Sequence, residues 1–428
     1  MSKKLAISGG EKIRNNPFPS HPMIGEEEKR AVLDVLNSGK LSTFIASPGA
    51  HFFGGIKIRE FEDKFKAYHN IKHAVAFNSA TAALHAAVVA CGVQPGEEVI
   101  TTPYSFTASA TCALMHNAVP VFADVKADTF NLDPKDIRKK VSPLTRAINV
   151  VHLYGNPADM DEIMQIAREK SLKVIEDCAQ APAAKYKDKL VGTIGDCGIF
   201  SFTETKTITS GEGGMLITHD DKIAEVAKLV RNHGEAVVEG QQVRTYKSFI
   251  LGYNYRMTEL DAAVGIEQFK KLDKFNDERI KLGDYLSQGL KRFKGITPPI
   301  VYQGNKHVYW MYGIKFDEKA VGVPRDSFVK ALQAEGIPCA PGYVKPLYYS
   351  PIYHENKPFI YQHYKGNAQY GPGSCPVAEE LHFHGLINTI ITRPPAGTTD
   401  MDDIINAFGK IIENKEELLV EAEESIQR

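Results

Sequence analysis

Between about residue 72 and residue 218, short apolar runs alternate with segments that have helical patterns. This alternation is typical of a mostly parallel β-sheet covered by helices. Because parallel strands are buried on both faces, they are expected to be apolar along their whole length, as these runs are. The sequence therefore predicts an α/β fold with a mostly parallel sheet of seven strands: His73–Phe77, Glu98–Thr102, Val119–Ala123, Ala147–Leu153, Lys173–Asp177, Gly198–Phe202 and Gly214–Thr218.

The length of 428 residues suggests about two or three domains. We expect an N-terminal arm and a large domain over residues 1–270, and a smaller α+β domain over residues 271–428. A helix over Glu26–Ser38, ended by Gly39, follows the proline-rich arm, and residues 41–55 are expected to form a loop. A helical stretch from Met257 to about Phe293 leads out of the large domain. The tail from Asp402 is expected to form a terminal helix.

Composition excludes several classes of protein. The 51 Lys and Arg residues balance the 52 Asp and Glu residues, so neither nucleic acid nor an anionic membrane surface is an expected partner. No apolar stretch reaches the roughly 18 residues of a membrane span, and the first residues lack the apolar run of a signal peptide. The six cysteines are scattered without a Cys-x-x-Cys pair. We therefore expect a cytoplasmic protein with reduced thiols.

A lysine and an acid lie where chemistry is expected. Asp177 closes the run Lys173–Asp177, and Lys206 lies between Ser201 and the glycine-rich stretch Gly211–Gly214. Pyridoxal phosphate (PLP) chemistry needs this pair, because the lysine amine forms a Schiff base with the cofactor aldehyde while a carboxylate keeps the pyridine nitrogen protonated. Taken singly, each residue has an ordinary alternative: Lys206 as an exposed loop lysine, and Asp177 as a helix N-cap.

Two segments suit a phosphate group. Asn78–Leu84 directly follows the first strand, and small residues at a helix start let free N–H groups approach an anion. Simple N-capping by Ser79 explains this segment alone better, but the downstream lysine and acid outweigh that interpretation. Ser201 has a spacing from Lys206 that suits a phosphate-binding hydroxyl, and the Ser210–Gly214 run leaves room for close backbone approach.

An aromatic ring and an amide complete the candidate site. Phe106, in the segment Pro103–Thr107, is preferred to Tyr104 as the ring that stacks on a flat cofactor. The alternative is an aromatic side chain in the core, which is the commoner fate of phenylalanine. Gln180 is expected one helical turn beyond Asp177, where it reaches either the cofactor or the helix backbone.

Other motifs predict no further chemistry. His382-Phe383-His384 alternates like a strand, and a solvated or core histidine pair is a better interpretation than a metal site, so no metal is expected. No Gly-x-x-x-x-Gly-Lys-Ser/Thr sequence occurs, and the glycines form no dinucleotide fingerprint. On spacing alone, Gly252–Met257 is interpreted equally well as a turn with a helix cap.

Taken together, these segments resemble the DegT/DnrJ/StrS family of PLP-dependent sugar aminotransferases. The similarity extends from about residue 18 to the C-terminal helix. It is carried by several motifs in the family's order: Asn78–Leu84, Pro103–Thr107, Val151–Gly155 with Ala158–Met160, Val174–Ala181, Ser201–Lys206 with Gly211–Gly214, Arg231–Gly234 and Gly252–Met257.

The resemblance implies the aspartate-aminotransferase type of fold (fold type I) and a homodimer with both active sites at the subunit interface. It identifies Lys206 with the Schiff-base lysine and Asp177 with the acid on the pyridine nitrogen. The other contacts that it implies are Phe106 stacked on the cofactor ring, Gln180 beside the ring, Ala80, Thr81 and Ser201 at the phosphate, and Asn254 reaching the phosphate from the other subunit.

The chain departs from the family pattern in three places. The loop Leu41–Gly55 is longer than usual, Glu204 adds an acid close to Lys206, and Thr392–Ala396 lacks the usual Leu-Pro-x-His form. Residues Gly54-Gly55 and the C-terminal region are more similar to the branch that aminates unattached rings, such as keto-inositols and aminohydroxybenzoate precursors.

The sequence thus predicts a PLP-dependent aminotransferase that moves an amino group from glutamate or glutamine to a keto or aldehyde sugar, nucleotide-linked or free, or to a cyclitol. One alternative is a PLP-dependent sugar dehydratase of the same fold, but those relatives replace the lysine with histidine. A non-catalytic regulatory homologue is disfavoured because neither Asp177 nor Lys206 is needed for packing. Arg231 and Arg256 are candidates for binding the donor's carboxylate.

Overall fold

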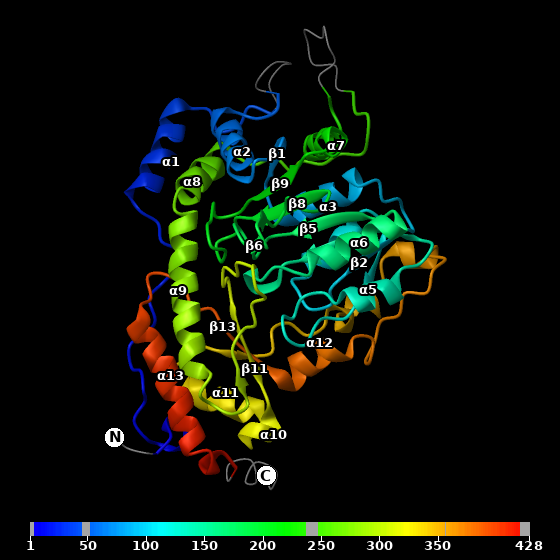
Figure 1. Cartoon of the computed structure of the whole chain (residues 1–428). Helices are drawn as coiled ribbons and strands as arrows, with labels where there is room; N and C mark the ends of the chain where they lie inside the picture. Colours follow the sequence, from blue (N-terminus) through cyan, green and yellow to red (C-terminus); the bar gives the residue numbers. More distant parts are fainter. Residues whose placement is uncertain (1–3, 45–51, 237–246, 356, 420–428) are drawn as a thin grey trace.

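A seven-stranded sheet lies at the centre of the computed structural model, which describes residues 4–44, 52–236, 247–355 and 357–419 (Figure 1). The strand order is β1-β9-β8-β5-β4-β2-β3. Only the pairings of β9, with β1 and with β8, are antiparallel. The strands are β1 (His73–Phe77), β2 (Glu98–Thr101), β3 (Val119–Phe122), β4 (Thr145–Val151), β5 (Lys173–Asp177), β8 (Cys197–Ser201) and β9 (Gly214–Thr218). The predicted α/β fold and mostly parallel sheet are confirmed.

Helices cover both faces of this sheet because successive residues of a strand point to opposite sides. In β1, Val75 and Phe77 join the core formed with α3, α4 and α7, whereas Ala74 and Ala76 join the core formed with α2 and α8. Helices α5 and α6 pack with residues of β2, β3 and β4. These helices are α2 (Ile56–His69), α3 (Ala80–Ala90), α4 (Ala108–Met115), α5 (Pro134–Lys140), α6 (Met160–Lys170), α7 (Asp221–Arg231) and α8 (Glu259–Phe269).

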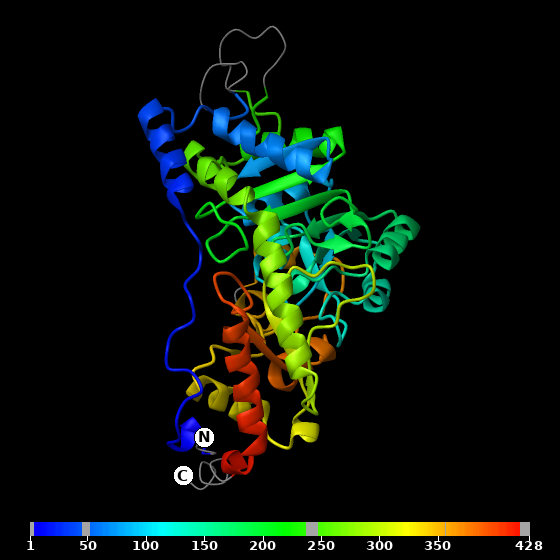
Figure 2. The ribbon, with the colours of Figure 1, turned by 60° about the vertical axis from the view of Figure 1, so that its left-hand side comes forward.

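A second, four-stranded sheet has its own core. Its order is β10-β11-β13-β12, and every pairing is antiparallel. Leu5 of the N-terminal arm is buried in this core, and the arm then extends along the molecule to α1 (Figure 2). The proposed division near residue 270 falls just before α9, which packs on α13 in this second core. The elements are β10 (Ile296–Thr297), β11 (Tyr312–Phe316), β12 (Ala340–Pro341), β13 (Leu386–Thr389), α9 (Leu272–Leu290), α10 (Glu318–Val321), α11 (Arg325–Ala334), α12 (Pro376–Glu380) and α13 (Thr398–Glu413).

The predicted and observed helix boundaries agree where a capping residue marks the end of the helix. Helix α1 spans Glu26–Ser38, and Gly39 follows it with a positive φ of 66°, a conformation that glycine adopts readily. The expected stretch from Met257 to Phe293 is two helices, α8 and α9, separated at residues 270–271. Helix α13 begins at Thr398, four residues before the expected start, because Asp400 accepts the N–H of Gly397 and caps it.

The strand expected at His382–His384 is wrong. Residues Leu381–Gly385 form a π-helical turn that continues α12, and β13 begins only at Leu386. The buried Arg325 stabilises this turn, since its guanidinium donates to the carbonyls of His382, Phe383 and Leu386. Alternation over three residues did not reveal that helix. A short hairpin of β6 (Lys185–Tyr186) and β7 (Lys189–Leu190) was not predicted either.

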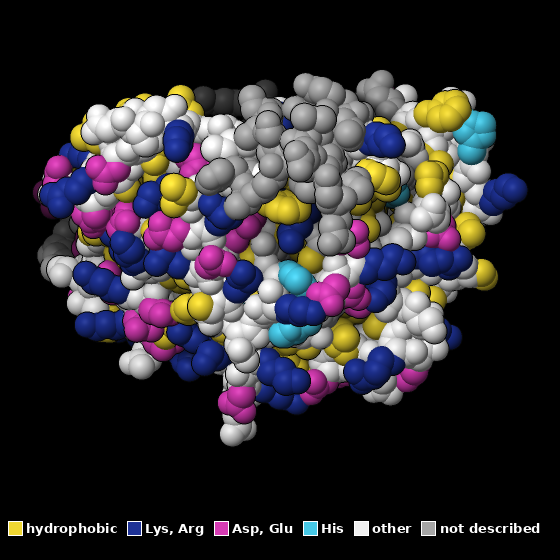
Figure 3. All heavy atoms as spheres, turned by 90° about the horizontal axis from the view of Figure 1, so that it is seen from above, with side chains coloured by type: hydrophobic (Ala, Val, Ile, Leu, Met, Phe, Trp, Pro, Cys, Tyr) yellow, Lys and Arg dark blue, Asp and Glu magenta, His cyan; other side chains and the backbone are white. Residues whose placement is uncertain are grey.

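Among the described residues, no helix combines the length and the apolar character needed to cross a membrane. On the face seen in Figure 3, basic and acidic side chains are interspersed rather than gathered by sign. Of the longer loop predicted over residues 41–55, residues 45–51 lie outside the described residues.

Candidate active site

The carboxyl edge of the large sheet brings the predicted motifs together. Gly214, the first residue of β9, pairs with Phe77 at the end of β1 and with Ser201 at the end of β8. A Cβ on Gly214 would lie 2.5 Å from the carbonyl carbon of Ser79. Only glycine lets the strand pass so close to the start of α3, which confirms the close backbone approach predicted for the glycine-rich run.

A cavity of about 420 Å³ opens at this edge. Every predicted site residue except Asn254 lines it. The lining residues are Ser79, Ala80, Thr81, Leu84, Ser105, Phe106, Ala108, Ser109, Asp177, Ala179, Gln180, Ser201, Thr203, Thr205, Lys206, Glu212, Trp310 and Tyr343.

Lys206 is not the exposed loop lysine of the ordinary alternative, because only 9% of its surface is accessible. It lies in the loop between β8 and β9, and its Nζ is 4.0 Å from the centre of the Trp310 ring. Burial lowers the pKa of Lys206 to about 8, although the charge of Asp177 acts in the opposite direction. Near neutral pH the amine therefore has an appreciable neutral fraction, which a nucleophile or proton acceptor requires.

Asp177 is held by groups that donate to both of its carboxylate oxygens. The Ser109 hydroxyl donates to Oδ2 at 2.8 Å, and the N–H of Ala179 donates to Oδ1 at 3.1 Å. Burial raises the pKa of Asp177, whereas these hydrogen bonds and the charge of Lys206 act to lower it. The helix-cap alternative is wrong, because residues 178–184 form consecutive turns in which Pro182 has no N–H for a helix.

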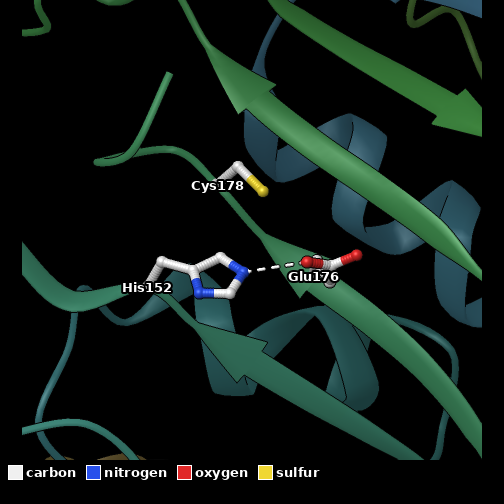
Figure 4. A group of neighbouring side chains, drawn as sticks. All are labelled: His152, Glu176 and Cys178. Carbon is white, nitrogen blue, oxygen red and sulfur yellow. Dashed lines mark hydrogen bonds and ion pairs between the residues drawn. The ribbon is translucent and has the colours of Figure 1, made fainter. Parts of the chain in front are cut away.

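A buried polar network lies next to Asp177 at the end of β5. His152, Glu176 and Cys178 form a group whose donor atoms could hold a metal ion (Figure 4). However, His152 Nδ1 accepts the N–H of Ala158 at 3.0 Å, so Nε2 carries the proton that it donates to Glu176 at 3.0 Å. Glu176 also accepts three backbone N–H groups, those of residues 192, 194 and 195. Because these atoms are already engaged in hydrogen bonds, we interpret the group as structural. It also positions Asp177, since the backbone N–H of His152 donates to the carbonyl of Asp177 at 3.1 Å.

The start of α3 is compatible with both interpretations of the Asn78–Leu84 segment, helix capping by Ser79 and phosphate binding. Ser79 is the N-cap, since its hydroxyl accepts the N–H of Ala82 at 3.1 Å. The following residues Ala80 and Thr81 line the cavity, and so does Ser201 from the end of β8. A helix N-terminus and a hydroxyl therefore converge on one end of the cavity, an arrangement that binds phosphate elsewhere.

The two aromatic candidates have different environments. Phe106 is 61% exposed and lines the cavity, whereas Tyr104 is fully buried. Gln180 lines the cavity too, but no helix follows Asp177, and its side chain instead accepts the backbone N–H of Tyr154 at 2.7 Å. Tyr154 has a positive φ of 60°, so this hydrogen bond fixes a strained turn beside the cavity.

The sequence analysis missed residues from distant segments. Trp310 packs on Lys206 and donates its indole N–H to the carbonyl of Thr205 at 3.0 Å. Tyr343 reaches the cavity from the loop after β12, and Ser109 bonds Asp177 from α4. The one available signal was that Trp310 is the chain's single tryptophan.

Other candidates lie away from the cavity. Glu204, expected close to Lys206, is exposed and lines a different groove, whereas Glu212 lines the cavity together with Asp177. Arg231 is buried in an ion pair with Glu62 at 2.7 Å, so it is a core residue rather than a substrate contact. Arg256 donates to Asn254 at 2.8 Å and does not line the cavity.

Fold and site together are those of an aminotransferase. The chain belongs to the DegT/DnrJ/EryC1/StrS aminotransferase family, whose model matches residues 22–407.

Similar proteins cover nearly the whole chain. It is 39% identical to the GDP-perosamine synthase of Caulobacter vibrioides over 91% of this chain and 97% of that protein. It is 33% identical to the L-glutamine:scyllo-inosose aminotransferase of Streptomyces griseus over 98% of this chain and 100% of that protein. Among solved structures, the aminotransferase from Psychrobacter cryohalolentis aligns with a TM-score of 0.82 and 27% identity, covering 93% of this chain and 99% of that chain.

Proposed function

We propose that this aminotransferase uses PLP to move an amino group from glutamate or glutamine to the keto or aldehyde carbon of a sugar or cyclitol, in the cytoplasm. The observation that carries the proposal is the meeting of Lys206, Asp177 and the start of α3 in one cavity. A buried amine, a buried carboxylate and free N–H groups match the aldehyde, the pyridine nitrogen and the phosphate of PLP in turn.

The residues present fit this cofactor. When bound, PLP supplies an electron sink for breaking the bonds at the donor's α-carbon. Lys206 would hold the cofactor, and Asp177 would pair with the ring nitrogen. Phe106 is free to cover one face of the ring, because 61% of its surface is accessible. Ala80, Thr81 and Ser201 would contact the phosphate, and Gln180 would lie beside the ring.

Lys206 also has a role after the donor has displaced it. Its amine would accept the proton from the donor's α-carbon and would return a proton to C4′ of the cofactor. Trp310 lies against Nζ at 4.0 Å and limits the access of water to it. A pKa of about 8 suits this exchange, since a group that both takes and gives a proton works best near the ambient pH.

The acceptor class follows from the relatives. One relative is named for a GDP-linked amino sugar and another for the amination of scyllo-inosose, with glutamine as the donor. Both names concern polyhydroxylated carbon skeletons. We therefore assign the acceptor to keto sugars, nucleotide-linked or free, and cyclitols, and the pathway to amino-sugar biosynthesis.

The purified holoenzyme should test this function directly. We expect a yellow protein whose visible absorbance falls when L-glutamate or L-glutamine is added, and returns when a keto acceptor follows. Nucleotide-linked keto sugars and free keto-inositols form the two arms of the acceptor screen. A holoenzyme whose absorbance responds to no amino donor would exclude the proposed reaction.

We propose further that the enzyme is a homodimer with shared active sites. Apolar side chains of the arm and α1 are exposed, with Ile24 at 48%, Leu33 at 56% and Leu36 at 50%. Ile24 and Leu33 line a groove of about 630 Å³ that also includes Thr209–Gly211 of the loop that carries Lys206. Such a patch beside the site supports a partner subunit there. Asn254 is exposed and outside its own chain's cavity, as a residue that serves the partner would be.

Complementation between variants tests this sharing. Lys206→Ala and Asn254→Ala should each have low activity as homodimers. In a mixed dimer, one site would carry both changes and the other neither, so activity should rise toward one intact site per dimer. The control pairs Lys206→Ala with Asp177→Asn, which alter the same chain's cavity and should not complement. Mixed dimers of the first pair that gain no activity would place the role of Asn254 within its own chain.

A further inference from the structure

The backbone around Lys206 is held by side chains from two distant segments. The N–H of Lys206 donates within its own loop, to the carbonyl of Thr203 at 3.0 Å. Its carbonyl is 3.1 Å from Nε2 of His21, a residue of the N-terminal arm that lies 185 positions away in the sequence. The carbonyl of the preceding residue, Thr205, accepts the indole N–H of Trp310 at 3.0 Å. An imidazole and an indole therefore orient the two peptide groups that flank the reacting lysine.

The imidazole of His21 has a single proton to donate, and the Lys206 carbonyl receives it. A carbonyl oxygen only accepts hydrogen bonds, so Nε2 carries the proton, while Nδ1 is buried without a partner among the described residues. Burial lowers the pKa of His21 to about 4, and the charges of Arg393 and Arg279 act in the same direction, against the hydrogen bond to Lys206. The ring is therefore neutral near pH 7. In the part of the chain that the structure describes, it is the one hydrogen-bond partner of this carbonyl.

The arm is fixed on both sides of His21 by contacts that do not involve the reacting lysine. Before His21, the guanidinium of Arg14 is 2.7 Å from the carboxylate of Asp400 on α13, in the second core. After His21, the carbonyl of Met23 accepts the side-chain amide of Gln268 at 2.9 Å, from α8 of the large domain. Because both anchors are independent of the lysine, the hydrogen bond from His21 fixes the loop against the arm rather than the arm against the loop.

We propose that His21 is a positioning residue for transamination, which fixes the place of the Lys206 amine against Trp310. This inference rests on the proposed function, in which the amine must reach the donor's α-carbon and the cofactor in turn. A turn of the peptide group after Lys206 would move its Cα and carry the amine away from the Trp310 ring, whose centre is 4.0 Å from Nζ. A displacement of about 1 Å can slow catalysis by about 100-fold. His21 does not line the cavity, so its effect on the reaction is exerted through Lys206.

Variants that differ in the position of the donor test this hydrogen bond. His21→Gln places an amide N–H near the position of Nε2, the shorter His21→Asn places it near that of Nδ1, and His21→Phe keeps a ring without a donor. With L-glutamate and a keto acceptor, kcat should fall about 10- to 100-fold in His21→Phe and His21→Asn while the KM values stay near those of wild type. His21→Gln should recover most of this loss. The matched control is His219→Phe, which alters an exposed histidine outside the cavity lining.

Chemical labelling follows the amine without turnover. In the full chain before PLP is added, acetic anhydride should acetylate Lys206 in proportion to its neutral fraction, and peptide mapping measures the extent at each pH. In wild type, His21→Gln and His219→Phe, the midpoint should lie near pH 8, the pKa that burial gives Lys206. In His21→Phe and His21→Asn the amine, no longer held against Trp310, is more hydrated, and hydration favours its charged form. The midpoint should therefore rise toward 10.5, the value of an ordinary lysine.

The outcomes separate this inference from the proposed function. A midpoint that stays near pH 8 in His21→Phe, with kcat unchanged, would overturn the positioning role. Equal losses in His21→Gln and His21→Asn would overturn it too, because the position of the donor would then have no effect, and this comparison decides even where His21→Phe does not fold. If no amino donor changes the absorbance of the holoenzyme, the proposed function fails, yet the acetylation midpoints still decide whether His21 positions the amine.

Discussion

Lys206→Ala should reduce transamination by at least about 10²- to 10⁴-fold, the contribution of a group that transfers protons in the rate-limiting step. The reason is that one amine has two roles, holding the cofactor and moving the proton, and no other lysine in the described part of the chain lines the cavity. Steady-state turnover with L-glutamate and a keto acceptor measures the loss. Lys170→Ala, a change to an exposed lysine on α6, is the matched control and should leave turnover unaltered.

Chemical trapping locates the attachment separately from activity. Borohydride reduction of the holoenzyme, followed by peptide mapping, should place the cofactor on Lys206. The rate at which cofactor-free protein takes up PLP should rise with pH through about 8, because the amine is charged below that pKa and neutral above it. At pH 8 roughly half of Lys206 would be neutral, compared with roughly 1 in 300 for an ordinary lysine. An adduct on a different lysine would refute the assignment.

The sheet could be predicted because strands buried on both faces are continuous runs of apolar residues in the sequence. All seven strands lie where apolar runs were predicted, with ends within about two residues. Candidate site residues at the last position of a strand, such as Asp177 and Ser201, could be singled out for the same reason: once a parallel sheet is accepted, its carboxyl ends must lie at one edge.

Cavity-lining residues from segments distant in the sequence have no such local pattern. Trp310 and Tyr343 reach the cavity from the segments flanking β11 and β12, and only the packing of the second core against the large sheet puts them there. Gln180 lines the cavity, but the helix expected after Asp177 is absent, because Pro182 has no N–H for it.

Asp177→Asn should keep the fold and most of the bound cofactor, yet lose about 10²- to 10³-fold of transamination, as when a preorganised electrostatic contact is removed. The amide is accommodated because its oxygen can accept the N–H of Ala179, and the Ser109 hydroxyl can turn to accept from its NH₂. What the amide lacks is the negative charge that keeps the pyridine nitrogen protonated. Cofactor content, measured by absorbance, and the thermal unfolding temperature should therefore stay near the wild-type values while turnover falls.

Ser109→Ala is the control for this prediction. It removes the 2.8 Å hydrogen bond but keeps the carboxylate, so its turnover should fall by no more than about 10-fold, the effect of one hydrogen bond. Near-normal turnover in Asp177→Asn would mean that this buried acid contributes only to local structure.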